Sequence, residues 1–145
     1  MQREAWRTEP MANARCLDGS PAVVSILHRD PAKWIIFLQG GGWCYSLADC
    51  LHRAAYMPFG TSKGPPRIAE PCGLHQLEPF SNFSVASYRY CDGAAFGGTA
   101  GAVGPAGRFR GVPTAVRFDG SLHLSEGIQL LRARYGLATA SEVML

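Results

Sequence analysis

The stretch Trp34-Ile-Ile-Phe-Leu-Gln-Gly-Gly-Gly-Trp-Cys44 combines a short apolar run with three consecutive glycines. Residues 34–39 contain two β-branched and two aromatic side chains. Such a segment is typical of a strand that is buried on both faces of a sheet. The sequence therefore predicts a core strand that ends abruptly at a glycine-rich turn.

The glycines alone leave two interpretations open. Glycine lets the backbone turn sharply and leaves the neighbouring N–H groups uncovered by a side chain. In α/β-hydrolases a glycine-rich loop at this point supplies the amides of an oxyanion hole, which hold the negative charge that develops during acyl transfer. The alternative is an ordinary tight turn after a core strand.

Composition indicates one globular domain. The chain has 145 residues, of which 47% are hydrophobic and 17% charged. Its net charge of +3 comes from scattered residues with no run of Lys or Arg, so nucleic acid is not expected as a partner. No apolar run is long enough to predict a membrane span, and residues 1–10 lack the apolar region of a signal peptide.

Cysteine usage leaves the cellular compartment open. The five cysteines form no C-x-x-C pair, no histidines show zinc-ligand spacing, and no nucleotide-binding glycine pattern occurs. We therefore expect neither a metal site nor a cofactor. Cys44 and Cys50 suit a small disulfide beside the glycines, whereas the alternative is free thiols in an intracellular protein. Asn82 begins a glycosylation sequon, which is relevant only in a secreted chain.

Hydrophobic periodicity and turn residues predict alternating strands and helices. Strands are expected at residues 22–28, 34–39 and 85–90, and the start of another at 141–145. Helices are expected at residues 46–58, with Ser46 as N-cap, and at 121–135, followed by Gly136. The remaining segments are expected to form a loose N-terminal arm at 1–15, a surface excursion at 60–79 and a flexible glycine-rich loop at 93–120. This order indicates an α/β sheet.

Three local sequences occur in order along the chain: Cys16-Leu-Asp-Gly-Ser-Pro21, Gly40-Gly-Gly-Trp-Cys44 with Cys50, and Arg89-Tyr-Cys-Asp-Gly-Ala-Ala-Phe96. Together they resemble one known family, the pectin acetylesterases with the Wnt-deacylating esterase Notum. The resemblance runs from about Cys16 to Leu145, and the triple glycine resembles the pectin acetylesterase form. It implies a serine carboxylesterase with an α/β-hydrolase fold, of which residues 16–145 would be the N-terminal part.

The resemblance assigns roles to several residues. Backbone N–H groups of Gly41, Gly42 and Trp43 would form part of the oxyanion hole, and Trp43 would line the acyl pocket or pack as a core aromatic. Cys44 would pair with Cys50, and Cys16 with Cys91, which leaves Cys72 without an assigned partner. Asp92 is expected to stabilise a Cys-Asp-Gly turn and not to act in catalysis. Gln39 stands where the family usually has Glu.

In this fold the triad runs Ser, Asp, His, and all three follow the glycine loop. We expect no Gly-x-Ser-x-Gly nucleophile elbow in the chain, since the triad residues of the family would follow Leu145. None of the four histidines, His28, His52, His75 and His123, is expected in a triad. The 145 residues alone should therefore be inactive as an esterase.

The resemblance implies that the complete enzyme deacetylates pectin or a related cell-wall polysaccharide as a secreted or cell-wall monomer, with no cofactor. A Notum-like protein deacylase is the alternative within the family. A non-catalytic binding protein derived from the esterase, or an unrelated Gly/Pro-rich α/β domain, are the alternatives outside it.

Overall fold

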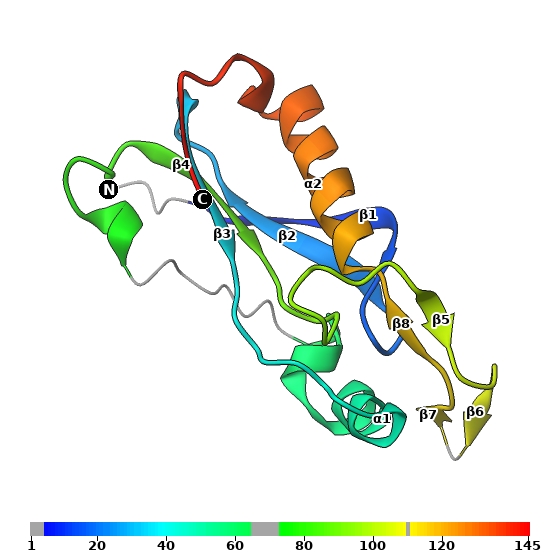
Figure 1. Ribbon diagram of the computed structural model, residues 1–145. Coiled ribbons are helices and arrows are strands. Elements are labelled where there is room, and N and C mark those ends of the chain that lie inside the picture. Colours follow the sequence, from blue (N-terminus) through cyan, green and yellow to red (C-terminus); the bar gives the residue numbers. More distant parts are fainter. Residues whose placement is uncertain (1–4, 65–72, 110) are drawn as a thin grey trace.

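The computed structural model describes residues 5–64, 73–109 and 111–145. Its main feature is a five-stranded mixed sheet with the order β1-β2-β4-β3-β9 (Figure 1). The strands are β1 (Arg7–Arg15), β2 (Pro21–Leu27), β3 (Asp30–Leu38), β4 (Phe83–Tyr88) and β9 (Glu142–Met144). The sheet confirms the α/β class and the strands expected around residues 22–28, 34–39, 85–90 and 141–145.

The direction of the strands decides where the loops gather. β1, β2 and β4 pair antiparallel, whereas β3 runs parallel to both of its neighbours, β4 and β9. Parallel strands present their carboxyl ends at the same edge of a sheet. The segments that follow β3 and β4 therefore meet at one edge, and β9 runs toward that edge as well.

Helix α2 (Gly120–Arg134) covers one face of the sheet and packs against β1 and β2 (Figure 1). Its close approach depends on Gly127, because a Cβ at this position would lie 2.4 Å from the buried ring of Tyr88. The helix ends as expected, since Gly136 follows it with a left-handed φ of 86°. The periodic residues at 121–135 thus predict this helix correctly.

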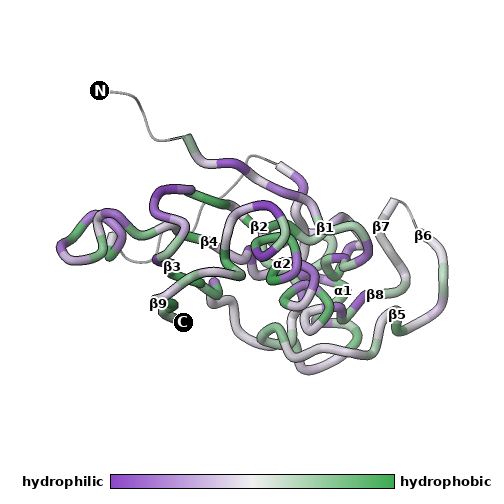
Figure 2. Tube along the Cα trace, turned by 90° about the horizontal axis from the view of Figure 1, so that it is seen from above, coloured by the Kyte–Doolittle hydropathy of each residue, from purple (hydrophilic) through white to green (hydrophobic). Residues whose placement is uncertain are grey.

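The core between sheet and helix is built from side chains of both. The buried set includes Met11, Val24, Trp34, Ile36, Tyr88, Tyr90, Phe96, Leu131 and Tyr135. Hydrophobic segments of the strands run beneath α2 in the view from above (Figure 2). Because the ends of β3 and β4 belong to this core, the loops after them start from fixed positions.

Helix α1 (Leu47–Tyr56) follows the glycines and begins where the sequence predicts. The Ser46 hydroxyl accepts a hydrogen bond from the Asp49 N–H, which satisfies a free donor of the first turn. Cys50 and Ala54 form the buried side of the helix, against Leu17 and Val116. A 3₁₀ turn at η1 (Pro58–Gly60) follows and packs against the helix.

The prediction of a loose N-terminal arm at residues 1–15 is wrong for residues 7–15. They form β1, which pairs with β2 and buries Met11 and Ala14. β1 is the outer strand of the sheet, so it tolerates Pro10 and polar side chains on its open side. The prediction fails because this edge strand lacks the hydrophobic alternation that a half-buried strand shows.

The glycine-rich stretch 93–120 is also more ordered than the expected flexible loop. It contains β5 (Gly101–Val103), which pairs with β8 (Val116–Phe118), and β6 (Arg108–Phe109), which pairs with β7 (Val112–Pro113). Two further 3₁₀ turns occur, η2 (Leu74–Gln76) and η3 (Leu137–Thr139). Residues 65–72 of the expected surface excursion, which include Cys72, lie outside the described residues. No helix in the described ranges is long and apolar enough to cross a membrane.

Candidate active site

The glycine loop, residues 40–43, leaves the carboxyl end of β3 and leads to α1. Gly40, Gly42 and Trp43 are exposed, and Trp43 keeps 72% of its surface open. Trp43 therefore does not pack in a core formed by the described residues. The loop lies at the sheet edge where the segment after β4 also emerges (Figure 1).

Three consecutive carbonyl oxygens of the glycine loop are engaged on one side. The Arg53 guanidinium donates from Nη1 to Gly41 O at 2.9 Å and to Gly42 O at 2.8 Å. Its Nη2 donates to Trp43 O at 2.9 Å. The Tyr90 hydroxyl donates a further bond of 2.6 Å to Gly42 O.

The amides of the loop point the other way. In a trans peptide the N–H of each residue is antiparallel to the preceding C=O. The carbonyls of Gly41 and Gly42 face Arg53, so the N–H groups of Gly42 and Trp43 are directed away from it. Among the described residues, neither these two amides nor that of Gly41 has a hydrogen-bond acceptor. An oxygen atom from outside could accept from them.

The end of the loop is anchored to the neighbouring segments. The Cys44 N–H donates to Gly93 O at 3.0 Å, and the Tyr45 N–H donates to Asp49 Oδ2 at 3.3 Å. A disulfide joins Cys44 to Cys50 on α1, as the resemblance implies. Covalent and polar links therefore follow directly on the free amides and limit their movement.

Gln39 has a structural role just before the loop. Its side-chain Oε1 accepts a hydrogen bond of 3.0 Å from the Tyr90 N–H. This bond needs only a hydrogen-bond acceptor at position 39, and an amide oxygen can accept as a carboxylate oxygen does. Gln39 therefore keeps the strand ends of β3 and β4 together with a neutral side chain.

A cavity of about 300 Å³ opens beside Trp43. Its other walls come from the end of the glycine loop, from the segment after β4 and from β8: Cys44, Gly93, Ala94, Gly97, Gly98 and Phe118. The lining is mostly backbone and apolar side chains. A small apolar group could enter it next to the free amides.

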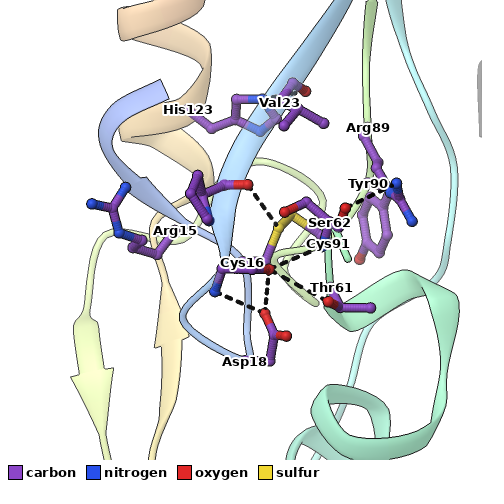
Figure 3. Close-up of a disulfide and its surroundings, with 12 residues drawn as sticks. Arg15, Cys16, Asp18, Val23, Thr61, Ser62, Arg89, Tyr90, Cys91 and His123 are labelled. Atoms are coloured by element: carbon purple, nitrogen blue, oxygen red, sulfur yellow. Dashed lines mark hydrogen bonds between the residues drawn. A yellow bond between two sulfur atoms is a disulfide. The ribbon is translucent and has the colours of Figure 1, made fainter. Parts of the chain in front are cut away.

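The second segment at this edge is the closed loop, residues 89–98, which follows β4. The predicted disulfide between Cys16 and Cys91 ties it to the turn after β1, and Figure 3 shows this bridge with its surroundings. The Leu17 N–H also donates to Cys91 O at 2.8 Å. Both predicted disulfides are thus confirmed.

Asp92 lies inside the closed loop and is only 2% exposed. Burial raises the pKa of its carboxyl group, and the backbone N–H groups of Phe96 and Ala94 offset part of that effect. Its Oδ2 lies against the start of α2, where a Cβ on Gly120 would approach it to 2.0 Å. Neither Asp92 oxygen has a hydrogen-bond partner among the described residues, so the bond to its own turn that the sequence leads us to expect is not formed.

The histidines are placed apart from one another. His123 on α2 is buried and bonds through Nε2 to Val23 O at 3.0 Å, at the top of Figure 3. Burial lowers its pKa to about 4, so it is neutral at neutral pH and donates this bond. His28 Nε2 contacts Tyr135 O, His75 is buried beside Trp6, and His52 lies against Tyr56 on α1.

The sequence does contain one Gly-x-Ser-x-Gly pattern, Gly60-Thr-Ser-Lys-Gly64. The expectation that the chain lacks this pattern is therefore wrong for the sequence. The setting of this pattern is not that of a nucleophile elbow, which requires a sharp turn from a strand into a helix. Ser62 follows the 3₁₀ turn η1 in an irregular segment, and its N–H donates to Ser20 Oγ. No histidine contact to Ser62 is present among the described residues.

Arg53 is the residue at this site that sequence reasoning does not find. An arginine in the second half of a short helix carries no signal of what its side chain will reach. Within the described residues, no group of three or more His, Cys, Asp or Glu side chains could hold a metal ion.

Comparison with known proteins places this geometry in a family. The sequence matches the family model for pectinacetylesterase over residues 5–145. It is 35% identical over 115 residues to pectin acetylesterase 7 and 35% identical over 111 residues to pectin acetylesterase 11, both of Arabidopsis thaliana. Each match covers 68% of this chain and 27% of the relative. The chain thus spans about a quarter of the length of these curated relatives.

The fold has a solved counterpart as well. The Wnt deacylase Notum from Drosophila aligns with a TM-score of 0.75 and 25% sequence identity, over 97% of this chain and 42% of that chain. The mixed sheet with its few helices is therefore part of an α/β-hydrolase-like domain. With its sequence matched from residue 5 to residue 145, the chain belongs to the pectinacetylesterase family.

Proposed function

We propose that this chain is the N-terminal part of a serine carboxylesterase domain and that its glycine loop supplies the oxyanion hole. The amides of Gly41, Gly42 and Trp43 would donate to the oxygen of the tetrahedral intermediate. Such donors typically contribute about 3–4 kcal/mol each to lowering the barrier. The substrate would be an acetylated pectin or a related cell-wall polysaccharide.

One observation carries this proposal: the loop presents its amides without an acceptor while three consecutive carbonyls are bonded. An ordinary tight turn does not need an arginine to bond its carbonyl groups from behind. Here three bonds from Arg53 hold the carbonyls on one side. Preorganised donors of this kind act on charge that develops during a reaction.

The position of β9 supports the same conclusion. It pairs parallel with β3, Trp34 opposite Val143 and Ile35 opposite Met144. A nucleophile that followed β9 would reach the sheet edge where the glycine loop lies, as the elbow of this fold requires. The role of the 145 residues would be to position the transition state, while Ser, Asp and His would follow Leu145.

The cavity beside Trp43 would accept the small acyl group. It is mostly apolar and about 300 Å³ in volume, which leaves room for an acetyl group and part of a sugar ring. The two disulfides favour an oxidising environment, in agreement with a secreted or cell-wall protein. Asn82 is exposed in the turn before β4, so a glycan could be attached there.

The test compares two forms of the protein. Residues 1–145 and the longest natural form are assayed for acetate release from p-nitrophenyl acetate and from acetylated pectin, with labelling by a fluorophosphonate. We expect hydrolysis and serine labelling for the longer form only. Hydrolysis by residues 1–145 would refute the placement of the nucleophile beyond Leu145.

The remaining alternatives give other results. A longer form that cleaves an acylated peptide but leaves pectin intact would be a protein deacylase of the Notum kind. If the longest natural form binds pectin but is not labelled by the fluorophosphonate, it would be a non-catalytic binding protein. In either case the oxyanion-hole proposal for polysaccharide esters fails.

A further inference from the structure

The side chain of Arg53 lies behind the glycine loop and bonds three consecutive carbonyls. Its three bonds to Gly41, Gly42 and Trp43 are all between 2.8 and 2.9 Å long. The guanidinium is a planar fork with five donors. A single planar group with several donors can therefore fix the orientation of three peptide planes at once.

Arg53 is itself held in place by α1. The side chain is 16% exposed and its Nε lies 3.9 Å from Asp49 Oδ2, one turn earlier on the helix. The first turn of α1 is fixed by the Ser46 cap and by the Cys44–Cys50 disulfide. Behind Arg53 the chain packs tightly, since a Cβ on Gly60 would lie 2.5 Å from the Arg53 carbonyl oxygen. The guanidinium thus projects from a rigid support.

These contacts argue against a substrate-binding role for Arg53. A cation near the site of an esterase for acidic polysaccharides invites the idea that it binds a uronate carboxylate. Both terminal nitrogens of Arg53, however, are already bonded to the loop, and its Nε faces Asp49. Three of the four terminal N–H groups are used in this way, so a two-bond contact to a carboxylate through both terminal nitrogens would break a bond to the loop. The effect of Arg53 is therefore directed at the backbone.

We propose that Arg53 is a positioning residue for the oxyanion hole: by bonding the carbonyls of Gly41, Gly42 and Trp43, it turns the amides of Gly42 and Trp43 toward the reacting oxygen. This proposal rests on the function proposed above. Hydrogen bonds from a charged donor are shorter and stronger than those between neutral groups. They also polarise the peptide groups, which strengthens the N–H on the opposite side as a donor.

The test uses Arg53→Gln and Arg53→Lys in the longest natural form, with Arg132→Gln as the matched control on the exposed side of α2. For Arg53→Gln we expect kcat on p-nitrophenyl acetate to fall about 10- to 100-fold, less than the loss of a donor itself, while KM changes less than about threefold. The kcat of Arg53→Lys should lie between those of the parent and Arg53→Gln, because one ammonium group cannot bond three carbonyls at once. Arg132→Gln should match the parent.

A second readout is independent of catalysis. The Cys44 amide donates to Gly93 O at the end of the loop, so its hydrogen exchange, measured by NMR, reports loop order. We expect its exchange to speed up at least tenfold in Arg53→Gln and to stay unchanged in Arg132→Gln. If the parent cleaves no ester, the proposed function fails, and this exchange rate alone decides whether Arg53 holds the loop.

Two results would overturn the proposal. One is an Arg53→Gln variant with kcat within twofold of the parent and unchanged exchange at Cys44. The other is a variant whose loss appears only in KM for acidic polymers, which would make Arg53 a substrate contact. If Arg53→Gln does not fold, Arg53→Lys supplies both readouts.

Discussion

The two loops at the carboxyl edge of the sheet show opposite solutions to the same backbone problem. The closed loop after β4 is buried at Tyr90, Cys91 and Asp92, and it is tied to the turn after β1 by a disulfide. The glycine loop after β3 is largely exposed, and its amides have no acceptor among the described residues. Both start from adjacent parallel strands of one core.

This difference between the two loops indicates which of them can bind a reacting group. A buried backbone must satisfy its polar groups within the protein. The closed loop fills the interior and supports its neighbour, whereas the glycine loop leaves donors free but fixes their direction from behind through Arg53. We therefore expect stability to depend chiefly on the closed loop, and the proposed catalysis to depend on the glycine loop.

The largest expected effect on stability comes from removing the anchor of the closed loop. Cys16 and Cys91 enclose a separation of 75 residues, and the chain-entropy relation gives about 4.5 kcal/mol for a loop of that length. The double variant Cys16→Ser/Cys91→Ser should lose about that much in urea unfolding.

The other disulfide provides the matched comparison. Cys44 and Cys50 are six residues apart, so the same relation gives only about 2 kcal/mol. Cys44→Ser/Cys50→Ser should therefore unfold at a clearly higher urea concentration than the first double variant. Equal losses would show that the two loops are not divided into a stabilising and a functional one.

Gly41→Ala should remove activity through a steric contact. A Cβ at Gly41 would lie 2.1 Å from the Tyr90 ring, so either the ring or the loop has to move. We expect kcat in the longest natural form to fall about 10²–10³-fold, the loss typical of a missing oxyanion donor. Gly40→Ala is the control, because a Cβ at Gly40 would meet nothing within 4 Å. A similar loss in both variants would point to glycine flexibility and not to this contact.

His123 on α2 packs against the closed loop and should make the free energy of unfolding depend on pH. Its ring lies 5.7 Å from the Phe96 ring and 5.3 Å from the Tyr88 ring. Its pKa falls from 6.5 to about 4 in the folded chain because of burial. Below pH 6.5 the unfolded chain takes up a proton that the folded chain does not, so stability is complete above pH 6.5 and is lost as the pH falls toward 4. The loss amounts to about 3 kcal/mol.

His123→Gln should remove most of this slope. The measurement is urea unfolding at pH 7 and at pH 4.5, with the exposed His52→Gln as control. The Asp92 carboxyl acts in the opposite direction, since its raised pKa makes the folded chain take up a proton first as the pH falls. The effect of His123 is therefore read from the difference between variant and parent. An unchanged slope in His123→Gln would contradict the assignment.

Much of the scaffold could be predicted because its signals are local. The periodic residues at 121–135 predict a helix close to its observed bounds, and the apolar run at 34–39 predicts a strand that in the structure already begins at Asp30. The spacing of Cys44 and Cys50 suggests their disulfide but leaves free thiols as an alternative, whereas the Cys16–Cys91 disulfide follows only from the resemblance of the three motifs. β1 escapes prediction because only Met11 and Ala14 of that strand are buried, too few to produce a period.

The site was predictable only in part, for a physical reason. Three glycines predict that amides are uncovered, but the direction of those amides depends on what bonds the carbonyls. That partner, Arg53, lies ten or more residues further along the chain, in a different element. Conversely, the letters Gly60-Thr-Ser-Lys-Gly64 match an elbow although the backbone there makes no strand-to-helix turn.

Tyr90 connects the two loops through its hydroxyl group. Removing that hydroxyl tests whether the closed loop helps to orient the amides of the glycine loop. The hydroxyl donates to Gly42 O at 2.6 Å and accepts from the Ala95 N–H at 3.3 Å. Burial raises the pKa of Tyr90, so the group stays a donor at neutral pH. Tyr90→Phe keeps the ring against Gly41 and removes only these two bonds, at a cost of about 1 kcal/mol in stability.

Because Arg53 still bonds Gly42 O at 2.8 Å in that variant, the amides of the glycine loop should keep their direction. We expect kcat to fall only a few-fold, well short of the loss in Arg53→Gln, with Tyr45→Phe on the exposed side of the loop as control. A fall as large as that of Arg53→Gln would mean that the closed loop, acting through Tyr90, orients the amides as strongly as the helix does. The two loops would then have to be treated as one catalytic unit.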